Sequence, residues 1–219
     1  MLTINNLYAG YSKDNPVLKG IDLTVSDGEV VGILGRNGSG KSTLAKVICG
    51  IVPFVSGEIW LDDEQILGKQ TYEIARKGVG FFLQGGRVFG NLTVTENLHF
   101  ACSGLKNDEK NKRINEIRDW FEVLQKPGRL KMKATYLSGG EKHQLALAMV
   151  LLQKPKFLIL DEPSAGLSSA NSRLLFQTLF KIKESRLRGI LIIEQNISIA
   201  ASLCNNLLFM HESKLNFND

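Results

Sequence analysis

Apolar runs bounded by glycine, proline and polar residues alternate with helical patterns along the chain, as they do in α/β folds. Continuous apolar runs predict buried strands at residues 30–34, 79–83, 157–160 and 189–193. Helical spacing of apolar residues predicts helices that include residues 43–49, 97–101, 145–152 and 170–188. The pattern therefore predicts a core with a parallel sheet and intervening helices.

Two further strand patterns precede this core. Residues 2–8 alternate enough for a half-buried strand, and residues 17–25 follow after a polar turn. Because a turn joins the two strands, they predict an N-terminal antiparallel β layer beside the core. Weaker strand patterns occur at residues 58–61 and 205–210, and a break is expected at residues 52–57.

A helical and basic stretch interrupts the alternation of strands and helices. Within one predicted helix at residues 108–125, the apolar residues at helical spacing are Ile114, Ile117, Phe121 and Leu124. Pro127-Gly128 ends this pattern. We expect residues 1–219 to form a single domain, with approximately residues 92–150 as a helical subdomain inserted into its core.

The segment Gly35–Thr43 matches the P-loop pattern, in which a glycine, four free positions and Gly-Lys-Ser/Thr connect a strand to a helix. Its glycines let backbone N–H groups approach a polyphosphate, and the helix that follows points its positive end at the phosphates. Lys41 supplies a charge for the β- and γ-phosphates, and Ser42 offers a hydroxyl to Mg²⁺. The residues predicted to contact the nucleotide are Gly35, Asn37, Gly38, Ser39, Gly40, Lys41, Ser42 and Thr43.

Two acidic residues follow the apolar strand at residues 157–160. Asp161, at the end of a core strand beside a P-loop, suits a Mg²⁺ contact. The adjacent Glu162 can orient or deprotonate a water for attack on the γ-phosphate. Adjacent acids at a buried strand end would otherwise repel each other, which favours this functional interpretation. Gln84 also ends a core strand, where ligands bind in α/β domains.

A second helix start is rich in glycine. Ser138 is a good N-cap residue, and Gly139 and Gly140 leave backbone N–H groups exposed to an anion. Taken by itself, the pattern favours an ordinary N-cap turn. Tyr11 lies in the polar turn at residues 9–16, where it either stacks on adenine or packs within the turn.

Composition narrows the class of protein. The formal net charge is +5, and residues 104–133 alone contain nine basic and five acidic residues, a balance of +4. Acids are interspersed with the basic residues, so a solvated helical face is favoured over a nucleic-acid patch. No apolar run approaches the roughly 18 residues of a membrane span, and no signal peptide is recognisable. The three cysteines show no metal-type spacing, and we expect them to be buried thiols in the cytosol.

The order of these motifs resembles that of the ATP-binding cassette (ABC) ATPases over nearly the whole chain. The most specific motif is Leu-Ser-Gly-Gly-Glu at residues 137–141, because few other P-loop families carry it. The resemblance implies a P-loop NTPase core of the RecA-like type, ATP and Mg²⁺ as cofactors, and ATP hydrolysis. Tyr11 then resembles the adenine-stacking aromatic residue, and Gln84 the residue that meets the Mg²⁺ and water site.

The resemblance also implies roles for the strand ends and for the second glycine-rich turn. Ser138, Gly139 and Gly140 resemble the signature that binds the γ-phosphate of ATP held by an opposite protomer. Asp161 resembles the Mg²⁺ aspartate, beside the metal contacts Ser42 and Gln84. Residues with catalytic roles are then Glu162, Lys41 and Gln195.

Three positions depart from the pattern of the family. Gln195 stands where histidine is usual, and its amide can donate to a phosphate oxygen but cannot take up charge. Ser168 and Met149 stand where aspartate and arginine are common. Lys41, Asp161 and Glu162 are unaffected, so hydrolysis is still expected.

Glu194-Gln195-Asn196 and the stretch from Gln84 to Leu98 are most similar to the ATPase subunits of branched-chain amino-acid (or urea and amide) uptake systems. This resemblance implies an ATP-hydrolysing subunit that dimerises with a second ABC ATPase subunit, identical or different. Separate integral membrane permease subunits would place it at the cytoplasmic face of the cell membrane, with no nucleic acid expected. The alternative is a soluble ABC ATPase of translation, repair or Fe–S assembly.

Overall fold

The computed structural model describes residues 1–217, without the side chains of residues 183–186 and 217. Its internal contacts divide the chain into two compact units. One, here called the core unit, consists of residues 1–81, 156–162 and 187–219; the other, the helical unit, consists of residues 82–155 and 163–186. Each unit is interrupted in sequence by the other.

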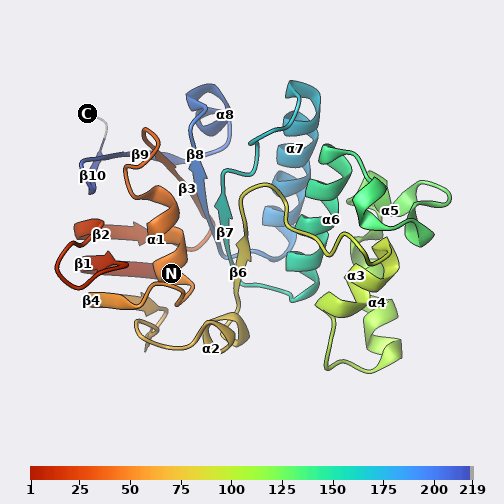
Figure 1. Cartoon of the computed structure of the whole chain (residues 1–219), viewed down its shortest axis with the longest axis horizontal. Helices are drawn as coiled ribbons and strands as arrows, with labels where there is room; N and C mark the ends of the chain where they lie inside the picture. Colours follow the sequence, from red (N-terminus) through yellow and green to blue (C-terminus); the bar gives the residue numbers. More distant parts are fainter. Residues whose placement is uncertain (218–219) are drawn as a thin grey trace. The chain divides into compact units, whose positions relative to one another are not determined.

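A mixed six-stranded sheet forms part of the core unit, in the order β10-β9-β3-β8-β7-β6 (Figure 1). Parallel pairs join β3 to β8 and β9, and β7 to β8, whereas β10 runs antiparallel to β9. Every residue of β7 and β8 is buried, as the continuous apolar runs predict. The strands are β3 (Glu29–Leu34), β6 (Val79–Phe82), β7 (Phe157–Asp161), β8 (Gly189–Glu194), β9 (Asn206–His211) and β10 (Lys214–Phe217).

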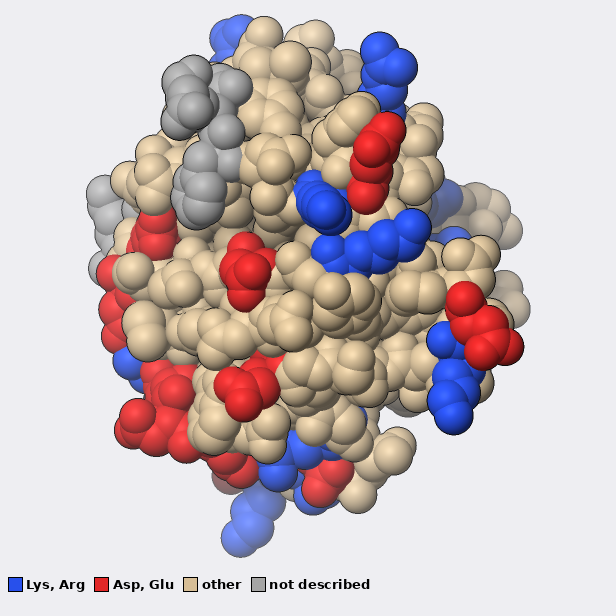
Figure 2. All heavy atoms as spheres, turned by 90° about the vertical axis from the view of Figure 1, so that its left-hand side faces the viewer, with Lys and Arg blue, Asp and Glu red and all other residues tan. Residues whose placement is uncertain are grey.

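The predicted N-terminal antiparallel layer is confirmed as a four-stranded sheet in the order β2-β1-β4-β5. It comprises β1 (Leu2–Gly10), β2 (Leu18–Val25), β4 (Phe54–Leu61) and β5 (Glu64–Gln65). The helices of the core unit are α1 (Lys41–Ile48), α2 (Thr71–Arg76) and α8 (Ile197–Ala201). On the face that Figure 2 presents, basic and acidic side chains are intermingled with uncharged residues.

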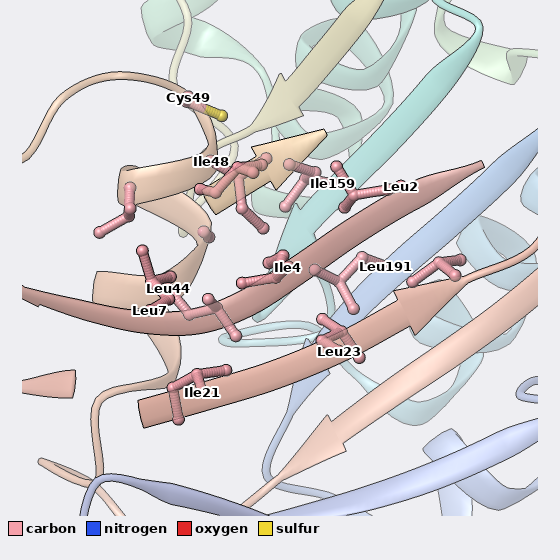
Figure 3. Close-up of a cluster of buried hydrophobic side chains, with 14 of the residues drawn as sticks. Leu2, Ile4, Leu7, Ile21, Leu23, Leu44, Ile48, Cys49, Ile159 and Leu191 are labelled. Atoms are coloured by element: carbon pink, nitrogen blue, oxygen red, sulfur yellow. The ribbon is translucent and has the colours of Figure 1, made fainter. Parts of the chain in front are cut away.

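The apolar core of this unit lies between the antiparallel layer, α1 and the buried parallel strands (Figure 3). Leu44 and Ile48 of α1 face Ile4 and Leu7 of β1 because they recur at helical spacing against a strand that alternates. The side chains labelled in Figure 3 are Leu2, Ile4, Leu7, Ile21, Leu23, Leu44, Ile48, Cys49, Ile159 and Leu191. One shared core therefore fixes α1, and with it the loop that precedes this helix.

Two strand predictions for the core unit were wrong. Residues 54–57 are not a break, because β4 begins at Phe54 and pairs with β1 as far as Gly10. Gly57 takes a positive φ of 105° where the register between β1 and β4 shifts. The glycine therefore forms a β-bulge within the strand, where its presence in the sequence suggests a break. Strand β10 was not predicted, since its four residues are held by pairing with β9.

The cysteines largely follow the expectation. Cys49 and Cys102 are buried free thiols, whereas Cys204 is half-buried. Burial, with a smaller contribution from Asp161, raises the pKa of the Cys49 thiol to about 12, so this side chain behaves as an inert apolar group.

Helices α3 to α7 make up the helical unit (Figure 1). They are α3 (Val94–Ala101), α4 (Asn107–Arg118), α5 (Glu122–Gln125), α6 (Gly139–Leu152) and α7 (Ser169–Arg186). Helix α6 packs against α3, α4, α5 and α7. No helix among the described residues is both long and apolar enough to cross a bilayer.

The single helix predicted at residues 108–125 was wrong, because it is broken between α4 and α5. Phe121 is extended and buried, and it acts as the N-cap of α5. The backbone N–H of Val123 donates to Oε1 of Gln144 on α6, 3.0 Å away. A side chain from α6 thus satisfies the new helix start, and this tertiary contact has no signal in the local sequence.

The loop before α3 is held by one buried polar side chain. Asn97 is fully buried, and its Oδ1 accepts from the backbone N–H of Phe89 at 2.8 Å. Its Nδ2 donates to the carbonyl oxygens of Phe89 and Thr93 at 3.0 and 2.9 Å. Thr93 is the N-cap of α3 in a capping box with Glu96. Asn97 therefore ties the loop to the helix that it precedes.

Replacing Asn97 with alanine should lower the free energy of unfolding by about 2–3 kcal/mol, because a buried N–H loses its acceptor. Urea titration followed by circular dichroism measures the loss. Hydrogen exchange should also accelerate at the Phe89 amide.

The exposed Asn91 in the same loop provides the control. Asn91→Ala should change stability by no more than about 0.5 kcal/mol. Equal shifts in the two variants would show that Asn97 does not hold the loop.

Candidate active site

The carboxyl ends of three core strands meet at one edge of the sheet. Leu34 of β3 pairs with Glu194 of β8, and Asp161 of β7 pairs with Ile193 of β8. Parallel strands in this register release their following residues on the same side. The P-loop, Glu162 and Gln195 therefore start from neighbouring positions.

The P-loop connects β3 directly to α1, as predicted. Gly40 is the N-cap of α1 with φ 107°, a left-handed conformation that glycine adopts without strain. A Cβ atom at Gly35 would overlap the carbonyl oxygen of Met210 and lie 2.9 Å from Oγ of Ser39. These two positions therefore require glycine, and a loop of this kind lets the backbone approach an anion closely.

Lys41 folds back over the loop. Its ammonium donates to the carbonyl oxygens of Gly35 and Arg36, at 2.8 and 2.9 Å, and the residue is only 4% exposed. Burial lowers its pKa, and the nearby carboxylates Glu162 and Asp161 oppose this shift. The charge of Lys41 thus sits over the cradle beside two acids.

Ser42 and Asp161 are in direct contact. Oγ of Ser42 donates to Oδ1 of Asp161 at 2.9 Å, and Asp161 is almost fully buried. Burial raises the pKa of the Asp161 carboxyl, the bond from Ser42 acts in the opposite direction, and Glu162 adds to the rise. The hydroxyl and carboxylate form a pair of hard oxygen donors of the kind that Mg²⁺ prefers.

Glu162 is buried, and hydrogen bonds hold both its backbone and its side chain. Its backbone N–H donates to the carbonyl of Ile193 at 2.9 Å, and its φ is +46°, in the left-handed region. Nε2 of Gln195 donates to its Oε1. Gln195 thus orients the carboxylate from the neighbouring strand end, in the place where the pattern of the family expects histidine.

The remaining predicted residues of the core unit line the same loop. Asn37 and Gly38 are exposed at its tip, and Thr43 is buried in the first turn of α1. The buried Oγ of Ser39 has no hydrogen-bond partner among the described residues, as expected of a group that serves a ligand. A phosphate oxygen would satisfy it.

The donor set for a cation is small. Within the described part of the chain, no three His, Cys, Asp or Glu side chains are grouped to hold a metal ion. A Mg²⁺ ion at Ser42 and Asp161 would therefore take its other ligands from phosphate oxygens and water, which is its usual preference. The residues present fit a nucleotide-bound cation rather than a permanently held one.

Tyr11 lies in the loop between β1 and β2 and is 53% exposed. The loop ends at Val17 and Leu18, whose side chains lie next to Gly40 at the start of α1. The ring of Tyr11 thus lies on a loop whose end is anchored beside the P-loop. That this ring stacks on a base stays a prediction.

The second glycine-rich turn, Ser138–Gly140, opens α6 in the helical unit; we call it the signature turn. Ser138 is the N-cap, as predicted, and its Oγ accepts from the backbone N–H of Glu141 at 3.2 Å. Ser138 and Gly139 are exposed at the start of this 14-residue helix, whereas Gly140 is buried beside Asn171. This geometry suits an anion from outside the helical unit.

Gln84 also lies in the helical unit, directly after β6. The backbone N–H of Gly86 donates to the carbonyl of Leu83 at 3.2 Å, which closes a four-residue turn. We call Leu83–Gly86 the glutamine turn. Gln84 is exposed at its first central position. The core unit thus gathers the P-loop, Asp161, Glu162 and Gln195, whereas Gln84 and the signature turn belong to the helical unit.

Several contacts around the signature turn escaped the sequence analysis. Oε1 of Glu141 accepts from Nε of Arg129 at 2.8 Å, and its other oxygen accepts from the backbone N–H of Ser138. Burial would raise the pKa of Glu141, but these hydrogen bonds prevail and lower it. The Ser-x-x-Glu spacing could have revealed the capping box. No local signal reveals Arg129, or Asn171 against Gly140.

Comparison with known protein families matches residues 18–165 to the family described as ABC transporter. A probable branched-chain amino acid transport ATP-binding protein, LivF of Archaeoglobus fulgidus, is 34% identical over all of this chain and 91% of its own length. The lipopolysaccharide export system ATP-binding protein LptB of Escherichia coli is 32% identical over 98% of this chain and 88% of its own length.

A solved structure is similar over almost the whole fold. The chain of cbiO1 from Clostridium perfringens, part of the ABC transporter complex cbiONQ, superposes with a TM-score of 0.84 at 30% identity. The match covers 99% of this chain and 86% of that one. Together with the family match, these similarities show that the chain belongs to the ABC transporter family as one of its ATP-binding, ATP-hydrolysing subunits.

Proposed function

We propose that this subunit powers the uptake of branched-chain amino acids, or of related small polar solutes such as amides and urea, through separate membrane permease subunits. The observation that carries its catalytic part is the group formed by Lys41, Ser42, Asp161 and Glu162 at one sheet edge. The relative named for amino-acid transport, at 34% identity, supports the class of solute.

The P-loop residues bind the triphosphate of ATP. Lys41 moves its ammonium from the carbonyl oxygens of the loop to the β- and γ-phosphates, which are stronger acceptors. Ser42 and Asp161 hold Mg²⁺, which neutralises charge on the phosphates when it is bound. Tyr11 stacks on the adenine from the loop before β2.

Glu162 activates the attacking water. Its carboxylate accepts the water's proton as the oxygen approaches the γ-phosphate in line with the leaving group. Gln195 keeps that carboxylate in one orientation through the bond from Nε2 to Oε1. An amide cannot become charged, so Gln195 positions the carboxylate and donates to phosphate oxygen without taking a proton itself.

The helical unit supplies the other half of a shared site. The start of α6, where Ser138 and Gly139 are exposed, binds the γ-phosphate of ATP held by a second ABC ATPase subunit, which is either a copy of this chain or a related one. Gln84 joins the Mg²⁺ and water site. Residues 1–219 act as one ATPase domain with residues 92–150 as its helical subdomain, at the cytoplasmic face of the membrane.

The variant Glu162→Gln tests the catalytic assignment. Removing the base should reduce ATP turnover by roughly 10²- to 10⁴-fold while ATP still binds, because Lys41 and the loop are unchanged. Phosphate release measures turnover, and light scattering measures the ATP-stabilised dimer that should accumulate. Wild-type turnover in this variant would overturn the role of Glu162.

Two substitutions at Gln195 test its positioning role. Gln195→Ala should lower kcat by roughly tenfold or more, because Glu162 loses its orienting donor, whereas the KM for ATP should change little. Gln195→His should retain turnover within about threefold, since an imidazole N–H can make the same bond. If alanine is as active as glutamine, the carboxylate is oriented by other means.

The solute class is tested in proteoliposomes that contain the chain and its copurified membrane subunits. Leucine, presented with the matching binding protein, should stimulate ATP turnover by at least about threefold over basal turnover. Purified lipopolysaccharide replaces leucine in a parallel assay, because a relative of 32% identity is named for its export. Stimulation by the lipid alone would overturn the proposal of amino-acid uptake.

A further inference from the structure

His143 occupies a buried position in the first turns of α6. The residue is 5% exposed, and its Nδ1 lies 2.9 Å from the carbonyl oxygen of Gly139. A carbonyl can only accept, so Nδ1 carries the proton and donates. The imidazole is therefore tied to the first helical residue of the signature turn.

The glutamine turn packs against the same ring. Gly86, which closes this turn, is buried although Gly85 and Arg87 on either side are exposed. The ring of Phe82, just before the turn, lies 5.9 Å from the imidazole, centroid to centroid, with the planes inclined at 44°. His143 thus contacts both the start and the end of the segment that carries Gln84.

The approach at Gly86 is too tight for a side chain unless His143 shifts. A Cβ atom there would lie 3.0 Å from Cα and 3.1 Å from Cγ and Nδ1 of His143. These separations are well below the roughly 3.5–4.0 Å at which carbon atoms pack best. At Gly85 a Cβ would have no described atom within 4 Å, although both glycines are left-handed, with φ +79° and +60°.

Space filling alone does not account for histidine at this position. Nε2 of His143 is buried and has no hydrogen-bond partner within the described part of the chain. A leucine side chain would fill similar space without leaving a buried polar atom unpaired, which is unfavourable. What the imidazole adds is the bond to Gly139, and hence a directional link to the signature turn.

We propose that His143 is a positioning residue that couples the signature turn to the glutamine turn, so that γ-phosphate binding at Ser138–Gly140 sets the orientation of Gln84. This inference rests on the roles proposed above for those two turns. A displacement of the first turn of α6 moves the imidazole with Gly139. The closely packed Gly86 must follow, because tight packing transmits such shifts.

The geometry predicts that substitutions at Gly86 and His143 have non-additive effects. Gly86→Ala should lower kcat for ATP at least about fivefold more than Gly85→Ala, because only the first substitution pushes on the ring. Gly85→Ala strains the same turn through its left-handed backbone and serves as the matched control. In the His143→Ala background, Gly86→Ala should have no further effect on kcat, because the ring it pushes on is gone, whereas Gly85→Ala should lower kcat by the same factor in both backgrounds.

Two further single variants separate positioning from packing. His143→Gln keeps a donor for the Gly139 carbonyl and should retain kcat within about twofold. His143→Leu keeps most of the volume but loses the bond, and should lower kcat at least about fivefold. Binding of a fluorescent ATP analogue to the P-loop should be unchanged in both, whereas partial unfolding would lower binding and turnover together.

Each result decides the inference. Loss of the Gly86→Ala effect in the His143→Ala background, together with the difference between the glutamine and leucine variants, supports it. A Gly86→Ala effect that persists in that background, an equal loss of the Gly85→Ala effect, or wild-type turnover in His143→Leu overturns it. Thermal unfolding of every variant identifies any variant that does not fold. The comparison that does not use that variant then decides the inference. Loss of turnover in Glu162→Gln separately shows that the proposed catalytic site is sound.

Discussion

The parallel register of β3, β7 and β8 is the constraint on which the candidate site depends. It places the P-loop, the acidic pair and Gln195 at one edge of the sheet. Side chains alternate along a strand, so a slip of one residue would turn Asp161 to the opposite face and break its bond to Ser42. Every residue of β7 and β8 is buried, so such a slip would also require the side chains on both faces of these strands to repack.

Burial also sets the electrostatics of the site. It lowers the pKa of Lys41 and raises that of Asp161, and each charge partly offsets the desolvation of the other. The site contains the Lys41 ammonium and the carboxylates of Asp161 and Glu162, so its positive charge does not balance its negative charge even before a polyphosphate binds. The amides of the P-loop, the dipole of α1 and a bound cation therefore have to supply the remaining compensation.

Local sequence patterns were sufficient for the features that short-range chemistry determines. The P-loop, the capping box at Thr93 and the N-cap at Ser138 all follow from side-chain bonds within a few residues. The break before α5 and the ion pair between Arg129 and Glu141 arise from contacts between distant segments. Their signals are spread over residues that the sequence alone does not show to be neighbours.

The left-handed backbone of Glu162 has a consequence for the evolution of this chain. A residue with a β-carbon in this conformation costs roughly 1–2 kcal/mol relative to ordinary backbone geometry. Glycine or asparagine would relieve much of that strain, but either would remove the carboxylate. The most stabilising replacements at this position are thus the ones that remove the proposed catalytic base, so with that role selection for activity acts against selection for stability here.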